Sequence, residues 1–419
     1  MVRPAYRRDH DLGTSERTMS PPATAVIIGG GIGGLATARA LHRQGIATTV
    51  YERRAESTDA GAGNGLVVWH NATIALRGLG LERELAGAGI PLQRYLFRSA
   101  TDHDLATWSL ADGARRTGAA AYTVARPELH RLLAEAAPGP IEYGAHCVGF
   151  AEDADGVLVR FADGREVRTD LLVGADGIRS VVRRQLIPAE PPPRHAGVRA
   201  WQGVVADPGG LPDGAFVNTF GRGLWFVCYR LAGGLVYWDG VVSDEVARDD
   251  HRLRDGQLGE QGKAFLTRLF GDWPGPIPEL IAATPANALQ PVDIADRDPV
   301  PRWSTDRVTL VGDAAHPMTF NLGQGANQAI EGATVLAGSL AAGPDLTTAL
   351  RRYDAARTDR TARLVRQSRA NGVFSRWRHP VVCAARDAFM RIAFPRLVYR
   401  KTYQLTMDLN PLTTTEGRP

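Results

Sequence analysis

An apolar run that passes directly into a glycine-rich turn constrains this chain more than any other feature. Residues 25–28 are apolar, and the pattern G-x-G-x-x-G follows, with Gly29, Gly31 and Gly34 at its fixed positions, before a helix-competent segment at 35–41. Gly29 permits a tight turn, Gly31 allows the backbone to approach a pyrophosphate, and Gly34 lets helix and strand pack closely. The pattern predicts a βαβ unit of the dinucleotide-binding type.

The following strand supports this interpretation. Residues 47–51 are apolar or β-branched and end in Glu52, which Arg53 follows. A carboxylate at the end of this strand can accept hydrogen bonds from both hydroxyls of an adenosine ribose. Strand, glycine turn, helix and acidic strand end therefore occur in the order that a nucleotide site requires.

A second acidic strand end lies almost three hundred residues later. The apolar run 308–311 breaks at Gly312 and Asp313, and a turn-rich loop leads through Gly323 and Gly325 into an alanine-rich helical segment. A carboxylate beside a glycine-opened helix N-terminus suits a ligand with hydroxyl groups and developing negative charge.

Composition limits the class of protein. A chain of 419 residues can form two or three domains, and a net charge of +4 gives no reason to expect nucleic-acid binding. The three cysteines Cys147, Cys228 and Cys383 are far apart, and the ten histidines form no ligand cluster, so we predict neither disulfides nor a metal site. No signal peptide or run of eighteen apolar residues occurs, which favours a cytoplasmic protein.

Local composition and the spacing of apolar residues along the chain predict an α/β fold in four parts. These are a disordered tail at 1–22, a discontinuous nucleotide-binding domain at 23–190 and 286–345, an inserted antiparallel-sheet domain at 191–285, and a helical region at 346–419. The inserted domain shows alternating strands rich in aromatic and β-branched residues at 198–205, 215–220, 224–229 and 235–242.

Three segments taken together, 29–34, 174–183 and 312–331, resemble the FAD-dependent monooxygenases of the p-hydroxybenzoate hydroxylase fold. The similarity is greatest to the salicylate-hydroxylase-like branch of the group A flavoprotein monooxygenases, and it covers about residues 23 to 395. The pattern Trp377-Arg378-His379-Pro380 also matches such proteins. The resemblance implies a Rossmann-like FAD-binding domain with an inserted substrate domain.

The resemblance also implies roles for individual residues. The glycines of the first motif would hold the pyrophosphate of FAD, and Glu52 its adenosine ribose. Arg126 would contact the pyrophosphate or ribityl region, Asp313 would hydrogen-bond the ribityl chain, and Asp176 would contact both FAD and NAD(P)H. The start of the later helix would face the N1–C2=O edge of the flavin. The full set of expected cofactor-binding residues is Gly29, Gly31, Gly34, Glu52, Arg53, Gly65, Arg126, Asp176, Asp313, Leu322, Gly323, Gly325 and Ala326.

The activity that the resemblance implies is oxygen transfer to a small molecule. NAD(P)H would reduce the flavin, O2 would add to form a C4a-hydroperoxyflavin, and an aromatic or similarly activated substrate would be hydroxylated. Only one G-x-G-x-x-G occurs, which indicates transient docking of NAD(P)H. We expect a monomer or homodimer whose partners are its substrate and O2.

Four positions depart from the family pattern. Phe320 and His70 each replace a proline, Gly332 replaces an aspartate after Glu331, and Gln202 replaces an arginine. Phe320 is a candidate wall for the substrate or a packing change, and His70 is a candidate general base or an ordinary hydrogen-bonding residue. No catalytic residue is otherwise assigned.

Aromatic residues of the inserted domain are candidates for the substrate pocket, although each also suits a core position. Strand alternation separates residues 225, 227 and 229 from 224, 226 and 228 without deciding which set faces inward. Few charges lie among them, which favours a largely apolar substrate. The candidates are Trp201, Phe220, Trp225, Tyr229, Trp238 and Phe320.

Three alternatives stay open. The same fold could epoxidise an alkene, act as an FAD-dependent reductase or dehydrogenase without oxygen transfer, or bind flavin or a small molecule without turnover. The basic, amphipathic segment 389–403 could touch a membrane or partner, but we expect it to pack on the protein itself because Pro395 interrupts it.

Overall fold

The computed structural model describes residues 22–56, 64–248 and 259–394. The tail expected at 1–22 lies outside these ranges except for its last residue, and so does the segment 389–403 after residue 394. Across the described ranges, no helix combines the length and apolarity needed to cross a bilayer.

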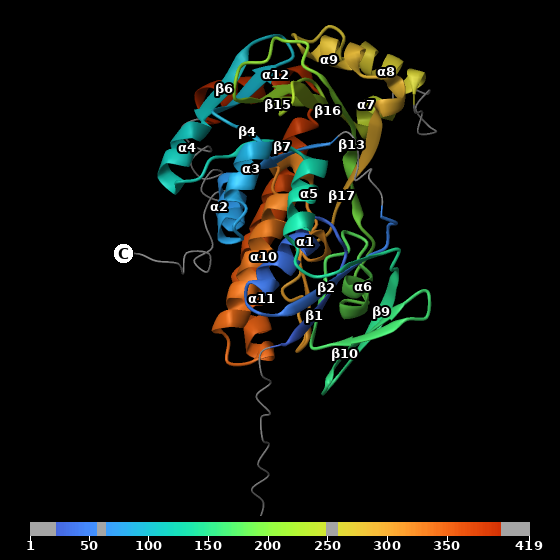
Figure 1. Cartoon of the computed structure of the whole chain (residues 1–419). Coiled ribbons are helices and arrows are strands. Elements are labelled where there is room, and N and C mark those ends of the chain that lie inside the picture. Colours follow the sequence, from blue (N-terminus) through green and yellow to red (C-terminus); the bar gives the residue numbers. More distant parts are fainter. Residues whose placement is uncertain (1–21, 57–63, 249–258, 395–419) are drawn as a thin grey trace, which may run out of the picture.

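A five-stranded parallel sheet carries the glycine motif. The strands at 24–28, 171–174 and 308–310 are buried on both faces, which explains why they are near-continuous apolar runs. Helices α1 (Ile32–His42), α5 (Arg126–Ala136) and α10 (Gly325–Ala342) pack beside it (Figure 1). In spatial order the strands are β18 (Val308–Leu310), β12 (Leu171–Gly174), β1 (Thr24–Ile28), β2 (Ala47–Glu52) and β8 (Ile141–Tyr143).

Two small sheets and four short helices complete this half of the molecule. One sheet joins β3 (Gly65–Val68), β7 (Tyr122–Ala125) and β4 (Ile90–Pro91), and the other joins β11 (Glu166–Thr169), β10 (Gly156–Phe161) and β9 (Cys147–Asp153). The helices are α2 (His70–Gly78), α3 (Glu82–Ala88), α4 (Leu110–Thr117) and α6 (Val181–Leu186).

A seven-stranded sheet forms the other half. All its neighbouring strands are antiparallel except one parallel pair, β14 with β5. Three of its strands come from outside the range 191–285, because β5 and β6 extend the free edge of β14 and β17 pairs with β13. In order the strands are β17 (Gln290–Asp296), β13 (Arg194–Ala206), β16 (Leu235–Ser243), β15 (Leu224–Leu231), β14 (Ala215–Phe220), β5 (Arg94–Ser99) and β6 (Asp104–Ser109).

Helices cover this sheet differently on its two faces. On the outer face α8 (Glu260–Phe270) and α9 (Ile277–Ala283) pack on an apolar cluster, with α7 (Asp244–Arg248) nearby and a 3-10 turn, η2 (Ala286–Ala288), after them. The inner face looks toward the parallel-sheet half. The long helix α11 (Leu346–Ser375) lies along α10, and α12 (Pro380–Ile392) packs against β6 (Figure 1).

A buried ion cluster joins α10 to α11. Glu331 is 1% exposed and accepts hydrogen bonds from Arg357 and from Arg360, whose Nε lies 2.6 Å from Oε1. Asn71 of α2 donates to the second carboxylate oxygen at 2.9 Å. Burial by itself would raise the pKa of Glu331, but the charges of Arg357 and Arg360 outweigh it and lower the pKa to about 2.

Replacing Glu331 with glutamine should destabilise the fold strongly. Two buried arginines would lose their carboxylate, and breaking a buried ion pair costs about 3–5 kcal/mol. Because the folded pKa lies below the unfolded value of 4.5, the contribution is present above pH 4.5 and is lost as the pH falls toward 2. Denaturant unfolding of wild type and variant should therefore differ at neutral pH and converge in acid.

The matched control is Glu135→Gln on α5. Glu135 pairs with Arg131 at 2.6 Å, but the two side chains are 61% and 50% exposed. Such a surface pair contributes little to the free energy of unfolding, because solvent screens the two charges. Equal effects of the two substitutions would show that burial of the Glu331 cluster is not what stabilises the α10–α11 contact.

Candidate active site

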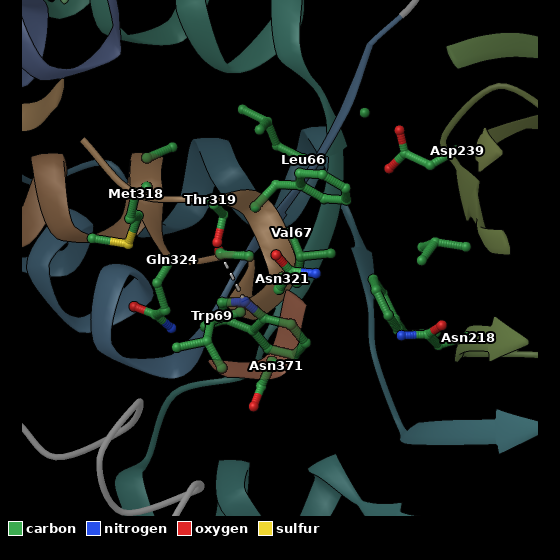
Figure 2. A pocket seen from close by; sticks show the side chains of 18 of the residues that line it. Leu66, Val67, Trp69, Asn218, Asp239, Met318, Thr319, Asn321, Gln324 and Asn371 are labelled. Atoms are coloured by element: carbon green, nitrogen blue, oxygen red, sulfur yellow. Dashed lines mark hydrogen bonds between the residues drawn. The ribbon is translucent and has the colours of Figure 1, made fainter. Parts of the chain in front are cut away.

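One cavity of about 600 Å³ lies between the parallel-sheet half, the seven-stranded sheet and the helices α11 and α12. Figure 2 shows its walls, with Gln324 and Thr319 on one side and Asn218 and Asp239 of the large sheet on the other. Of the residues expected to bind the cofactor, the structure brings eight to the cavity wall: Gly31, Gly65, Arg126, Asp313, Leu322, Gly323, Gly325 and Ala326.

The glycine motif forms one end of this cavity. Gly29 has φ +108°, and a Cβ there would lie 2.4 Å from the carbonyl oxygen of Ala175, so only glycine fits. A Cβ at Gly34 would lie 1.9 Å from the oxygen of Gly29, whereas one at Gly31 would meet no atom within 4 Å. Gly29 and Gly34 therefore close the turn, and Gly31 borders open space at the start of α1.

Glu52 is held by the turn that precedes α1. The N–H of Gly30 donates to Oε2 at 2.7 Å, and the N–H of Arg54 donates to Oε1 at 2.9 Å. Glu52 is half-buried, whereas Arg53 beside it is exposed. Both lie at the end of β2, next to the glycine turn but not on the wall of the cavity.

A second helix start opens at the same cavity. After β18 the chain forms two 3-10 turns, η3 (Gly312–Ala314) and η4 (Phe320–Leu322), and α10 begins at Gly325. Gly323 has φ +59°, and Asn327 holds this turn by donating to the oxygen of Gly323 at 2.7 Å and of Val67 at 2.8 Å. No side chain caps the N-terminus of α1 or of α10.

Asp313 and Arg126 are the charged groups between these helix starts. Both line the cavity and have exposed side chains. Desolvation by the surrounding protein raises the pKa of the Asp313 carboxyl, and the Arg126 guanidinium opposes that shift. The backbone N–H of Arg126 donates to the oxygen of Asn64 at 2.9 Å, which fixes the start of α5.

Asp176 has a structural task at the next turn. It accepts hydrogen bonds from the hydroxyl of Ser180 at 2.5 Å and the N–H of Val181 at 2.6 Å, so it anchors the start of α6. Desolvation raises the pKa of its carboxyl, against these hydrogen bonds. Arg183 of α6 is buried and donates to the oxygens of Ala314 and Ala315, which ties α6 to the Asp313 turn.

Gly65 allows close packing rather than a turn. A Cβ there would lie 2.7 Å from Cγ of Tyr237 and 2.9 Å from the hydroxyl of Tyr229. The start of β3 therefore lies against the large sheet. Residues 57–63, which precede Gly65 in the chain, lie outside the described ranges.

These features fit FAD. Two uncapped helix N-termini direct unpaired N–H groups and positive dipole ends toward one cavity, which suits a pyrophosphate and a flavin edge that gains negative charge. Open space borders Gly31, and the carboxylate of Asp313 faces the same space. A carboxylate of this kind can accept hydrogen bonds from a ribityl chain.

The inner face of the large sheet forms the opposite wall. Trp225, Val227 and Tyr229 face the cavity, whereas Phe226 and Cys228 lie in the outer apolar cluster. The structure thus settles which set of alternating residues faces inward. Phe220 lies on the inner face as well.

Two pocket predictions are wrong. Trp201 and Trp238 lie on the outer face, because the strand alternation points them away from the cavity. The indole N–H of Trp238 donates to Thr284 at 3.0 Å, and the ring of Trp201 packs on Phe265 of α8. Both are core residues of the outer layer.

Phe320 connects the cofactor loop to the sheet. Its ring is half-buried, lines the cavity and stacks on Trp225, with centroids 6.1 Å apart and an angle of 20° between the planes. The neighbouring Thr319 is fixed by Ser368 of α11, whose hydroxyl donates to the Thr319 carbonyl at 2.6 Å. Phe320 is therefore held as an apolar wall.

His70 does not lie at the cavity, so its prediction as a general base is wrong. It is fully buried at the start of α2, where its Nδ1 lies 2.7 Å from the oxygen of Ala119. Burial lowers its pKa. His316 is also buried, and desolvation lowers its pKa to about 3, so it is a neutral core residue.

Gly332 leaves room beside the buried ion cluster. A Cβ at this position would lie 3.5 Å from the hydroxyl of Tyr353 and 3.8 Å from Nε of Arg357. That Nε is buried without a hydrogen-bond partner among the described residues. The aspartate usual in the family would therefore face Arg357, and its absence leaves one carboxylate, Glu331, for two arginines.

Trp69 and Asp239 were not predicted as cavity residues, and Gln202 was singled out only as a departure from the family pattern. Trp69 donates from its ring nitrogen to the oxygen of Gly323 at 3.1 Å, and Asp239 and Gln202 lie side by side on the sheet. A charged residue within the buried strand 235–243 is a signal that could have identified Asp239. Further aromatic residues of the wall come from outside the predicted substrate domain: Tyr95, Phe97, Trp108, Phe374 and Phe394.

Comparison with known proteins agrees with this geometry. A family model described as an FAD binding domain matches residues 23–368. The aurachin C monooxygenase/isomerase of Stigmatella aurantiaca is 36% identical over 375 residues, which are 89% of this chain and 95% of that protein. An FAD-dependent urate hydroxylase of Klebsiella pneumoniae is 35% identical over 350 residues, which are 82% of this chain and 88% of that protein.

Solved structures give the same result. HpxO of Klebsiella pneumoniae, complexed with FAD and uric acid, has a TM-score of 0.83 at 30% identity and covers 93% of this chain and 97% of its own. A salicylate hydroxylase substrate complex shares the fold, with a TM-score of 0.71 at 22% identity. The family and the α/β fold class predicted from the three motifs are confirmed, and the chain belongs to the FAD-binding-domain family of flavoprotein monooxygenases.

Proposed function

We propose that this FAD-dependent oxidoreductase is a monooxygenase that hydroxylates a largely apolar aromatic small molecule. The observation that carries the proposal is a single cavity whose one wall holds the cofactor loops and whose other wall is built from aromatic side chains. NAD(P)H and O2 are the co-substrates typical of this family. Relatives named as urate, aminohydroxybenzoate and hydroxynicotinate oxygenases support an aromatic substrate.

The cofactor roles follow from position. The N–H groups at the start of α1, beside Gly31, would bind the pyrophosphate, and Glu52 would accept hydrogen bonds from the adenosine ribose. Asp313 would hold the ribityl hydroxyls, with Arg126 balancing its charge. The N–H groups at the start of α10 would stabilise negative charge on the reduced flavin.

The sheet and loop residues would orient the substrate and exclude water. Bound FAD supplies the redox and oxygen chemistry, and the protein supplies position, electrostatics and a dry site. Trp225 and Phe320 stack across the junction of sheet and loop, so they would close the cavity beside the reacting edge of the cofactor. Phe97 and Phe220, stacked at 5.7 Å, extend the apolar wall.

Labelled dioxygen tests this function directly. Purified protein would be given NAD(P)H, a panel of aromatic substrates and ¹⁸O2, and products would be analysed by mass spectrometry. We expect one labelled oxygen atom per product and substrate-stimulated oxidation of NAD(P)H. An epoxide carrying the label would indicate the alkene alternative.

Two other results would reject monooxygenation. Product that forms equally well without O2 would identify a reductase or dehydrogenase. Bound flavin with neither product nor substrate-stimulated NAD(P)H oxidation across the panel would identify a binding protein.

Asp313→Ala tests the cofactor site. Its carboxylate faces the cavity, so we expect an intact fold but weaker FAD binding, by about tenfold to hundredfold for lost hydrogen bonds to a charged group. Flavin absorbance after gel filtration and a fluorescence titration measure the loss. The control is Asp293→Ala, which changes an exposed residue that pairs with Arg199. Equal flavin content in both variants would show that Asp313 does not bind FAD.

Phe320→Ala tests exclusion of water. Removing the ring that stacks on Trp225 should admit water, so more of the NAD(P)H consumed should appear as hydrogen peroxide and less as product, with flavin content unchanged. Phe389→Ala removes a part-exposed ring of α12 that does not line the cavity and should leave this ratio unaltered. An unaltered ratio in Phe320→Ala as well would reduce Phe320 to a packing role.

A further inference from the structure

Asp239 is a buried carboxylate on the inner face of the large sheet. It lies on β16, pairs in register with Gln202 of β13 and Val227 of β15, and lines the cavity while only 7% exposed. Figure 2 shows its carboxyl group pointing away from the strand, toward Leu66 and the interior of the pocket. The cofactor roles proposed above do not use it.

The other buried carboxylates are matched within the protein. Within the described ranges, four acidic residues, Asp239 included, are less than a tenth exposed: Asp239, Asp296, Glu331 and Asp354. Three of them have cations or hydrogen-bond donors that explain their burial: Asp296 has Arg194 and Arg369, Glu331 has Arg357 and Arg360, and Asp354 has the N–H and hydroxyl of Ser304. Asp239 differs from these three because it lines the cavity.

Only neutral groups hold Asp239. The amide of Gln202 donates to Oδ1 at 2.8 Å, and the side chain of Tyr237 also hydrogen-bonds to the carboxyl group. No salt bridge to Asp239 occurs in the described part of the chain, and Arg126 is the one cation among the cavity residues described. Burial raises the pKa of Asp239 to about 6, although Tyr237 and Gln202 oppose the shift.

A charge buried with neutral partners alone is expensive and needs a reason. The carboxylate accepts hydrogen bonds and cannot donate them when ionised, so its natural partner is a donor. The walls around it are largely apolar, since Val227, Tyr229 and Trp225 share its face of the sheet. The missing partner therefore belongs to the molecule that enters the cavity.

We propose that Asp239 is a specificity-determining residue that accepts a hydrogen bond from a ring N–H, a phenolic or enolic O–H, or an amino group of the substrate. Gln202 holds the carboxylate in position for this contact. The inference rests on the proposed function, because it names the substrate class of the same site. A donor drawn toward a carboxylate enriches its aromatic ring in electrons, which favours transfer of an electrophilic oxygen.

Matched pairs of ligands test the proposal on the FAD-loaded enzyme. The probes are 2-naphthol with 2-methoxynaphthalene and indole with N-methylindole, so each pair differs in one donor. Binding is followed through the visible absorbance of the flavin. We expect wild type to bind the donor-bearing member about tenfold to hundredfold more tightly, the range for hydrogen bonds to a charged group.

Two variants and one control isolate the carboxylate. Asp239→Asn keeps the shape and should reduce the preference by about tenfold, and Asp239→Leu should abolish it. Asp293→Asn makes the same chemical change on an exposed residue of β17 and should keep the wild-type preference. Flavin content and melting temperature, measured on each sample, confirm that the variants are folded.

The proposal would be overturned if wild type bound both members of each ligand pair with the same affinity. It would also be overturned if Asp239→Asn and Asp239→Leu kept the wild-type ratio of affinities. The same samples are assayed for ¹⁸O incorporation. Absence of label in product from every sample rejects monooxygenation, whereas an unchanged binding preference with label still incorporated rejects only the role of Asp239. The two failures are therefore distinguishable.

Discussion

The buried ion cluster around Glu331 fixes the part of the molecule on which the cavity depends. It joins α10 to α11 through Arg357 and Arg360 and to α2 through Asn71, all in the interior. Because separating buried charges is costly, α10 cannot shift relative to α11 without breaking these contacts. Its N-terminus is therefore held beside the loop 312–324, where in the proposed cofactor site its N–H groups would stay oriented for a ligand that gains negative charge.

The large sheet separates two environments by the alternation of its side chains. On β15, Trp225 and Tyr229 face the cavity, whereas Phe226 packs under α8 and α9. A shift of register by one residue would exchange the two sets, so the outer core specifies the inner wall. Packing against α8 and α9 thus contributes to the pocket without touching it. This is why the outer tryptophan Trp238, although remote from the cavity, belongs to the architecture of the site.

Sequence could predict what local patterns encode. The glycine turn at Gly29, the acidic strand ends and the alternating strands depend on neighbours within a few residues, and the family assignment followed from them. The face of the sheet on which each side chain lies could not be predicted, because a strand buried on both sides is apolar on both faces. Trp201 was therefore assigned to the wrong face. The wall formed by Tyr95 and Phe97 was missed because β5 joins the sheet from far away in the chain.

Charge divides the cavity into two regions with different chemistry. At the cofactor end two helix N-termini present N–H groups beside the opposite charges of Asp313 and Arg126. Behind the cavity wall, Arg357 and Arg360 outnumber Glu331, the one carboxylate of α10, because Gly332 adds none. Both effects make that end favourable for anionic groups. At the sheet, Asp239 offers an acceptor with no cation beside it. Bound molecules that together place negative charge at the cofactor end and a hydrogen-bond donor at Asp239 satisfy both regions. An anionic substrate placed against Asp239 would satisfy neither.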